Sequence, residues 1–413
     1  MTGRIYPDWL DTYVNLRLPN TEAPAHVHFW CGVSAIAGAL QRKVWIDQVN
    51  FQWFPNFYIL IVAEPGIISK STSADLAIDL LKASKTANIG PSDTTHQALF
   101  QLFTKYSEMI EFEGGELVKQ SAMTILSSEL GNLIDPDNKQ QIDAYVTLFD
   151  GRREYEKVTK TAGNDSVQNA FLNLLACTTP QWMATSMPRV MIGGGLTSRI
   201  IWVVAEGKRQ VIAYPSRVVM KNHDQTQMNL VMDLQTISTL KGAYKIADDA
   251  MDWGDRWYTD LYHGRLDNPL FAMDAGNTFA RLQTQTHKLA MVLAASRRNE
   301  LVITLEDLKN AIHYIEETAR LAKPVFDKIG ATDMSRFRDM ILLRVQRAGR
   351  VEAIELYQQM GTLLPLKEDF DEIVNSLIAG EFMIRKQIGP KVYLISRDFL
   401  AQFGAGLKPA TPS

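Results

Sequence analysis

The chain has 413 residues, of which 46 % are hydrophobic and 22 % are charged. These fractions match globular proteins, which excludes wholesale disorder, collagen-like repeats and coiled-coil rods, and at about 100 to 200 residues per domain the length predicts two or three domains. The 43 Lys and Arg side chains nearly balance the 46 Asp and Glu side chains, giving a formal net charge of −3. A polyanionic partner would therefore have to meet a local basic patch.

Cysteine usage and the N-terminus indicate a soluble protein of a reducing cytoplasm. Cys31 and Cys177 are far apart and have no nearby His or Cys cluster, so neither a disulfide framework nor a zinc site is predicted. The first twenty residues carry Asp and Pro where a secretory signal needs an apolar core. The best apolar run, 57–62, is too short to span a bilayer, so we expect no membrane partner.

A helical segment, 1–50, is expected first, because Trp30, Val33, Ile36 and Leu40 have the spacing of a buried helix face. The pattern then changes to short apolar runs that alternate with helical periodicity, which predicts a parallel α/β core over residues 51–221. The expected strands are 57–62, 122–126, 172–177 and 200–204, and the expected helices between the first two are 71–83 and 93–106.

The C-terminal half has a different pattern. Residues 222–332 predict a helical subdomain, with its clearest helices at 278–297 and 305–329. Residues 333–400 predict three short helices and a β-hairpin, which is typical of a winged-helix-like domain. Acidic residues at the start of its third helix favour protein docking as much as DNA binding, and residues 401–413 are expected to be a flexible tail.

A candidate phosphate loop, Ala63-Glu-Pro-Gly-Ile-Ile-Ser-Lys-Ser-Thr72, follows the first strand and precedes a helix. In this context backbone N–H groups point at a phosphate, a lysine neutralises its charge and a hydroxyl binds Mg²⁺. Lys70 and Ser71 fit the last two roles. The motif is imperfect, because Ser69 replaces the usual glycine, and the alternative is an ordinary helix start capped by Ser69. The expected ligand contacts come from Pro65, Gly66, Ser69, Lys70, Ser71 and Thr72.

Polar residues also follow the second and third strands. Glu129 ends the second strand, where it could activate a water for attack on the γ-phosphate, and Ser128 stands where a metal-holding Asp is usual. The alternative is a carboxylate that caps a helix. Thr178 and Thr179 end the third strand and could bind the γ-phosphate or the attacking water.

Two basic features complete the candidate site. Three glycines, 193–195, predict a mobile turn before Arg199, which suits an arginine finger that reaches a neighbouring subunit, and the alternative is a surface arginine. Residues 150–163 predict a β-hairpin that could grip single-stranded DNA, and the alternative is a solvated face of mixed charge. The expected DNA contacts are Arg152, Arg153, Lys157 and Lys160.

The order of these motifs resembles the ATPase domain of phage, prophage and plasmid replication proteins of the helicase or primase-helicase type, within the additional-strand, catalytic-glutamate class. The resemblance covers about residues 5 to 300. It is carried by His28-Phe-Trp30, Phe54-Pro-Asn-Phe-Tyr58, Pro65-Gly66, Lys70-Ser71-Thr72, Ser128-Glu129-Leu130, Thr178-Thr179-Pro180, the turn before Arg199, Arg281 and His287-Lys-Leu-Ala290.

The resemblance implies a P-loop NTPase core of the RecA/AAA+ type in a hexameric ring, with ATP and Mg²⁺ between subunits. Arg199 would act in trans, and Arg281 would be a second sensor of the γ-phosphate unless it is structural. The expected function is a replicative helicase that moves on single-stranded DNA in a bacterial host cell, with a replication initiator or a primase as a possible partner. The alternatives are a slowly hydrolysing assembly switch, such as a helicase loader or a winged-helix regulator, and a scaffold that binds no nucleotide.

Overall fold

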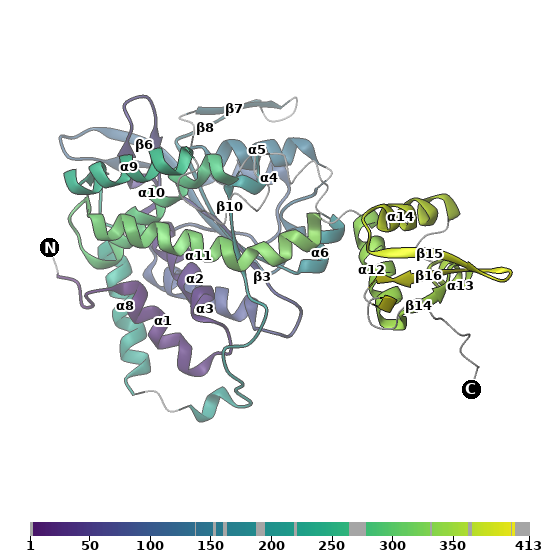
Figure 1. Ribbon diagram of the computed structural model, residues 1–413. Helices are drawn as coiled ribbons and strands as arrows, with labels where there is room; N and C mark the ends of the chain where they lie inside the picture. Colours follow the sequence, from purple (N-terminus) through teal and green to yellow (C-terminus); the bar gives the residue numbers. More distant parts are fainter. Residues whose placement is uncertain are drawn as a thin grey trace. The chain divides into compact units, whose positions relative to one another are not determined.

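The structure is a computed structural model. It describes residues 3–136, 138–151, 154–159, 163–186, 195–218, 221–263, 278–330, 333–361, 366–397 and 399–400. Contacts divide the chain into two compact units, Met1–Phe326 and Asp327–Ser413 (Figure 1). The expected segments 1–50 and 51–221 therefore belong to one unit, together with most of 222–332.

The first unit is built on a sheet that, within the described residues, has six strands. Five of them run parallel in the order β10-β3-β9-β6-β4, and β5 pairs antiparallel with β6. Their bounds are β3 Tyr58–Val62, β4 Ile89–Gly90, β5 Ser107–Glu111, β6 Leu117–Ser127, β9 Ala170–Thr178 and β10 Ile200–Val204. The four predicted strands and the α/β class are confirmed.

Strand β9 lies between β3 and β6, so the strand before the candidate phosphate loop is not adjacent to the strand that leads to Glu129. The register pairs Tyr58 with Leu174, and Leu174 with Ile125 on the other side. At the carboxyl edge of the sheet, Val62 pairs with Thr178. The carboxyl ends of β3, β9 and β6 are therefore close neighbours. The order of the strands along the chain does not by itself reveal that β9 lies in the middle.

Helices cover both faces of this sheet. On one face lies α2, where Asn173 Nδ2 donates to Ser34 O at 3.0 Å. Successive strand residues point to opposite faces, so Leu174 and its partner Tyr58 face the other way. There the Tyr58 hydroxyl donates to Tyr145 O on α5 at 2.7 Å. The result is a three-layered arrangement with the candidate phosphate loop at the carboxyl edge of the sheet.

The N-terminal segment supplies the helix at the centre of the unit. Its predicted buried face on α2 is confirmed, because Trp30, Val33, Ile36 and Leu40 are all fully buried. Figure 1 shows α2 beside α11, and Trp30 Nε1 donates to Thr318 Oγ1 of α11 at 2.8 Å. The first helices and 3₁₀ turns are α1 Trp9–Arg17, η1 Leu18–Asn20, α2 Ala25–Leu40, η2 Gln41–Lys43, α3 Lys70–Ser84, α4 His96–Lys105, η3 Leu130–Asn132, α5 Lys139–Phe149 and α6 Pro180–Ser186.

The predicted helices 278–297 and 305–329 are confirmed as α10 and α11. Short parallel pairs tie this helical part to the rest of the unit, since Val44 in β1 pairs with Gly242 in β11. The remaining elements of the unit are β1 Val44–Asp47, β2 Gln52–Trp53, β7 Glu154–Thr159, β8 Gly163–Gln168, η4 Thr197–Arg199, η5 Pro215–Arg217, α8 His223–Ile237, β11 Gly242–Ala243, β12 Lys245–Ile246, α9 Asp248–Tyr262, α10 Thr278–Arg297, β13 Val302–Ile303 and α11 Leu305–Gly330.

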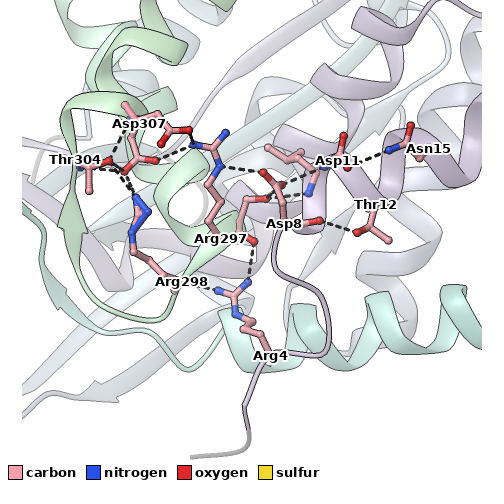
Figure 2. A network of polar contacts seen from close by, with 12 residues as sticks. Arg4, Asp8, Asp11, Thr12, Asn15, Arg297, Arg298, Thr304 and Asp307 are labelled. Carbon is pink, nitrogen blue, oxygen red and sulfur yellow. Dashed lines mark hydrogen bonds and ion pairs between the residues drawn. The ribbon is translucent and has the colours of Figure 1, made fainter.

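A polar network fastens the N-terminus to the junction of α10 and α11 (Figure 2). Arg4 donates to the carbonyls of Ser296 at 3.2 Å and Arg298 at 3.1 Å. Asp8 accepts from Arg297 Nε at 2.9 Å, and Arg297 also pairs with the fully buried carboxylate of Asp307 at 3.3 Å. Segments almost 300 residues apart in the chain are thereby held together.

The buried imidazole of His28 makes the first unit sensitive to acid. Its Nε2 lies 2.7 Å from Thr21 Oγ1, and burial together with Arg17 and Arg209 lowers the pKa of His28 from 6.5 to about 4. In the unfolded chain His28 therefore binds a proton near pH 6.5, whereas in the folded chain it stays neutral down to about pH 4. Consequently the contribution of His28 to stability is fully present above pH 6.5 and is lost as the pH falls.

We expect the free energy of unfolding to fall by about 2 kcal/mol between pH 7 and pH 5 through His28 alone, at about 1.4 kcal/mol per pH unit below its unfolded pKa. Urea titrations of the wild type and of His28→Gln at both pH values measure this difference. The matched control is His313→Gln, because the His313 side chain is 69 % exposed. An equal pH dependence in the wild type and in His28→Gln would contradict the assignment.

The second unit has the order helix, strand, helix, helix, strand, strand, and its strands pair antiparallel in the order β14-β16-β15. The predicted three helices and hairpin are confirmed, and the short strand β14 is additional. A core that includes Ile341, Phe370 and Leu394 holds these elements together. Their bounds are α12 Asp333–Ala348, β14 Arg350–Glu352, α13 Ala353–Met360, α14 Lys367–Ala379, β15 Met383–Ile388 and β16 Lys391–Ser396. The expected tail, 401–413, lies outside the described residues.

In the part of the chain that is described, no helix is long and apolar enough to cross a bilayer. Both cysteines, Cys31 and Cys177, are buried free thiols.

Candidate functional site

The loop between β3 and α3 forms one wall of a cleft at the carboxyl edge of the sheet. The loop leaves the sheet after Val62 and reaches the helix at Lys70, as the sequence predicts. Gly66 adopts φ +74°, a left-handed conformation that glycine accepts without a side-chain clash. Pro65 and Gly66 both line the cleft.

The start of α3 leaves backbone donors at this wall. The first bond of the helical ladder runs from the Ser73 N–H to Ser69 O at 2.9 Å, so the N–H groups of Ser71 and Thr72 precede it. The Ser69 side chain makes no capping hydrogen bond. Ser69 thus holds the N-cap position without a side-chain cap, and binding of a phosphate by this loop stays a prediction.

Lys70 folds back over the loop, and its Nζ donates to the carbonyl of Ala63. Burial lowers the pKa of Lys70 below its ordinary value, and the carboxylates of Glu64 and Glu129 partly oppose this shift. The ammonium group is thus held above the loop by a single neutral acceptor, which phosphate oxygens could replace with stronger, charge-assisted bonds.

The second wall comes from the end of β6. The Ser127 hydroxyl bonds to the carbonyls of Ser92 at 3.0 Å and Glu129 at 2.8 Å, which fixes the turn after the strand. Glu129 itself is extended, with φ −141° and ψ 123°, and its side chain does not cap the 3₁₀ turn that follows. The helix-cap alternative for Glu129 is wrong, and its exposed carboxylate lines the cleft.

The floor is the end of β9. Thr178 is buried, and its carbonyl accepts from the Ala63 N–H at 3.4 Å, which joins the floor to the loop. The Thr179 hydroxyl accepts from the Trp182 N–H at 3.1 Å and so caps α6. Its own hydrogen remains available to donate to a ligand.

Sequence reasoning missed Trp182 and Gly131, which also line the cleft. A Cβ atom at Gly131 would lie 3.1 Å from Trp182 Nε1, so the glycine leaves room for the indole ring. The available signal was the spacing of Thr179 and Trp182, because a threonine cap places the residue three positions later on the first turn of its helix.

The cleft has a volume of about 490 Å³. It brings together the sequence-predicted residues of all three strand ends, namely Pro65, Gly66, Ser69, Lys70, Ser71, Thr72, Glu129, Thr178 and Thr179. In the described part of the chain no group of three or more His, Cys, Asp or Glu side chains could hold a metal ion. A Mg²⁺ ion in this cleft would therefore rely on Ser71 and on the oxygens of its ligand and of water.

Arg199 does not reach this cleft. It lies just before β10, whose first residue pairs in parallel with Tyr58, so it occupies the amino edge of the sheet. Its guanidinium binds Asp150 in a bidentate manner, from Nε at 3.0 Å and from Nη2 at 2.7 Å. The alternative of a surface arginine is wrong, since Arg199 is 5 % exposed. Of the predicted glycine turn, residues 193 and 194 lie outside the described residues.

Arg281 and Lys288, both on α10, join the same cluster. Arg281 Nη1 lies 3.3 Å from Asp150 Oδ1, and burial lowers the pKa of Arg281. Lys288 is buried, with Nζ bonded to Asn56 Oδ1 at 2.8 Å and placed 3.8 Å from the centre of the Phe149 ring. The two arginines expected at the nucleotide are thus gathered around one carboxylate at the opposite edge of the sheet.

A hairpin is present, but it is shifted toward the C-terminus of the predicted segment 150–163: β7 lies within that segment, whereas β8 begins at Gly163, and the two pair antiparallel from Glu154↔Gln168 to Thr159↔Gly163. Three of the expected DNA contacts, Arg152, Arg153 and Lys160, lie outside the described residues, as does the side chain of Lys157. Their contact with DNA stays a prediction.

No protein-family model matches this chain, and no curated protein matches it. The function is therefore argued from the residues and their geometry.

Proposed function

We propose that the chain is an ATPase of the additional-strand, catalytic-glutamate class that drives movement along single-stranded DNA. One observation carries the proposal: a loop with Lys70 and Ser71, a carboxylate at Glu129 and a hydroxyl at Thr179 line a single cleft. The place of β9 between β3 and β6 supports the class, because an additional strand at that place distinguishes it.

The donors of the cleft fit ATP with Mg²⁺. The free N–H groups at the start of α3 and the Lys70 ammonium suit the phosphates, and the Ser71 hydroxyl suits the metal ion. Mg²⁺ would draw charge from the phosphate oxygens. Glu129 would accept the proton of an attacking water, and Thr178 or Thr179 would orient that water or the γ-phosphate.

The role proposed for Arg199 requires an exchange of partners. In a ring, the guanidinium would have to leave Asp150 and bind the phosphate of a nucleotide on the neighbouring subunit. Arg281 would have to make the same exchange to act as a second sensor. Single-stranded DNA would bind the hairpin β7–β8, and the second unit would dock a protein such as a replication initiator or primase.

A second candidate is the nucleotide-dependent assembly switch. It is favoured by Ser128, which lines the cleft where a metal-holding carboxylate is usual. With weaker metal ligation, ATP would bind and be cleaved slowly. The motor and the switch differ in the expected rate of ATP hydrolysis, and both are expected to bind ATP.

Lys70→Ala is expected to weaken ATP binding about 10- to 100-fold, since a hydrogen bond from a charged group contributes about 1.5 to 3 kcal/mol. Isothermal titration calorimetry with ATP and Mg²⁺ measures this loss, and steady-state hydrolysis with and without single-stranded DNA separates motor from switch. Stimulated turnover supports the motor, and tight binding without stimulation supports the switch.

The matched control is Lys82→Ala, because Lys82 lies on the same helix and its side chain is 50 % exposed. We expect this variant to bind ATP like the wild type. If the wild-type protein binds no ATP, only the scaffold interpretation remains. If Lys70→Ala binds ATP as tightly as the wild type, the loop does not bind the phosphates.

A further inference from the structure

A second cleft, of about 580 Å³, opens at the amino edge of the sheet, away from the phosphate loop. It lies between the hairpin β1–β2, the hairpin β5–β6 and β11, and we call it the aromatic cleft. Its main lining residues are Arg42, Trp45, Gln52, Phe54, Phe112 and Asn169.

Flat rings form much of this cleft. Trp45 and Phe112 meet edge to face with centroids 5.5 Å apart, and both are only partly buried. The guanidinium of Arg42 lies 3.8 Å from the centre of the buried Phe54 ring. Aromatic rings and guanidinium planes are the surfaces on which nucleobases stack in single-stranded complexes.

Polar groups stand beside the rings. Asn169 uses its Nδ2 to donate to Lys119 O at 2.8 Å, which leaves its Oδ1 to accept from a ligand. Gln52 contributes an amide, and the exposed Glu113 and Glu116 lie at the rim. Carboxylates there disfavour a phosphate and accept from the exocyclic amino group of a base. The cation Lys241 also lines the cleft, and its Nζ donates to Glu111 O at 3.1 Å. The cleft thus offers a planar ring both donors and acceptors for its edge.

The aromatic cleft lies at the root of the hairpin β7–β8. Arg42 Nη1 donates to Gly151 O at 2.7 Å and to Ala170 O at 3.3 Å, which are the residues on either side of the hairpin. A neighbouring hollow of about 510 Å³ shares Arg42 and Phe54 and extends to Asp150. The two hollows therefore lie where the hairpin joins the rest of the unit.

We propose that the aromatic cleft is a base-binding subsite for single-stranded DNA. A nucleobase enters it, stacks on one of the two rings, Trp45 or Phe112, and meets the other edge to face. It bonds through its edge to Gln52 or Asn169, while its phosphates stay outside with the hairpin. The inference rests on the proposed function for its choice of ligand. It adds a contact that reads the ring of the base, where the hairpin is expected to grip only the backbone.

The test compares two oligonucleotides of equal length and charge, oligo-dC and the same backbone with abasic sites, bound to the full-length protein. Fluorescence anisotropy is expected to show about tenfold tighter binding of oligo-dC, since stacking contributes about 1 to 3 kcal/mol per base. In Phe112→Leu, which keeps an apolar side chain and loses the flat ring, this ratio is expected to fall to about twofold, and Phe112→Tyr is expected to restore it.

The matched control is Tyr262→Leu, an aromatic residue that is 68 % exposed and lies outside the cleft. It is expected to keep the full ratio. Photocrosslinking of wild-type protein to 5-iododeoxyuridine oligonucleotides gives a readout independent of variant folding, and we expect the adduct on Trp45 or Phe112.

A wild-type ratio near one, an unchanged ratio in Phe112→Leu, or an adduct confined to other residues would each overturn the subsite. The outcomes also separate the two proposals. DNA-stimulated ATP hydrolysis together with an affinity ratio near one would contradict the subsite and support the motor. An affinity ratio that depends on Phe112, in a protein that binds no ATP, would contradict the motor and support the subsite.

Discussion

Glu129→Gln is expected to slow ATP hydrolysis at least about 100-fold and to leave ATP affinity within about twofold. Glutamine keeps the size of the side chain and cannot accept the proton of the attacking water, and general base catalysis typically contributes 10²- to 10⁴-fold. Because the Glu129 side chain caps no helix, its loss should not disturb the local backbone. Single-turnover hydrolysis and calorimetric ATP titrations separate the two effects.

Glu64→Gln is the matched control, since Glu64 is an exposed carboxylate on the phosphate loop that, like Glu129, raises the pKa of Lys70. We expect its hydrolysis rate to stay within about threefold of the wild type. If both variants lose activity equally, the effect is electrostatic and Glu129 is not the base. If Glu129→Gln hydrolyses ATP at the wild-type rate, the catalytic role of Glu129 is wrong. If the wild-type rate is itself slow and the substitution does not change it, the assembly switch is favoured.

Strands β3, β6, β9 and β10 could be predicted because each is an apolar or largely apolar run, even though β10 is an edge strand. All five residues of β3 and of β10 are buried, as a strand covered on both faces requires. Strands β4 and β5, which pair with the other side of β6, could not be predicted in this way. In β5 the sequence Ser-Glu-Met-Ile-Glu is mostly exposed, and β4 has two residues. Such strands exist because β6 offers them backbone partners, a fact that only the tertiary fold supplies.

The grouping of residues in the cleft beside the candidate phosphate loop could be predicted for a topological reason. Residues that follow parallel strands share one edge of the sheet, so Lys70, Glu129 and Thr179 could be placed together without knowledge of the register. By the same reasoning Arg199, which precedes a strand, belongs to the opposite edge, and the parallel order alone excludes it from the cleft of its own chain. The sequence does not reveal its partner, because Asp150 lies 49 residues away.

Within the described residues, the carboxylate of Asp150 forms ion pairs with both Arg199 and Arg281. Its side chain is 26 % exposed, and that of Arg199 is 6 % exposed. Asp150 also raises the pKa of the buried Lys288, whose own burial lowers that pKa well below its ordinary value. Two arginines thus pair with one carboxylate, which also acts electrostatically on a buried lysine.

Asp150→Ala is therefore expected to lower the free energy of unfolding by about 3 kcal/mol, because removal of one partner leaves buried charge without compensation. Urea unfolding followed by tryptophan fluorescence measures this loss in the first unit, which contains all eight tryptophans. The matched control is Asp79→Ala, whose carboxylate is 63 % exposed and pairs with Lys82 at 3.2 Å. It is expected to cost no more than about 0.5 kcal/mol.

A double variant decides whether charge is the cause. In Asp150→Ala combined with Arg281→Met, one unpaired cation is gone, so the loss should be about 1 kcal/mol smaller than the sum of the two single losses. Strict additivity would show that Asp150 acts through packing and not through the arginines. A loss for Asp150→Ala as small as that of the control would mean that Arg199 does not need this carboxylate, and that it is free to exchange partners with a neighbouring subunit at little cost.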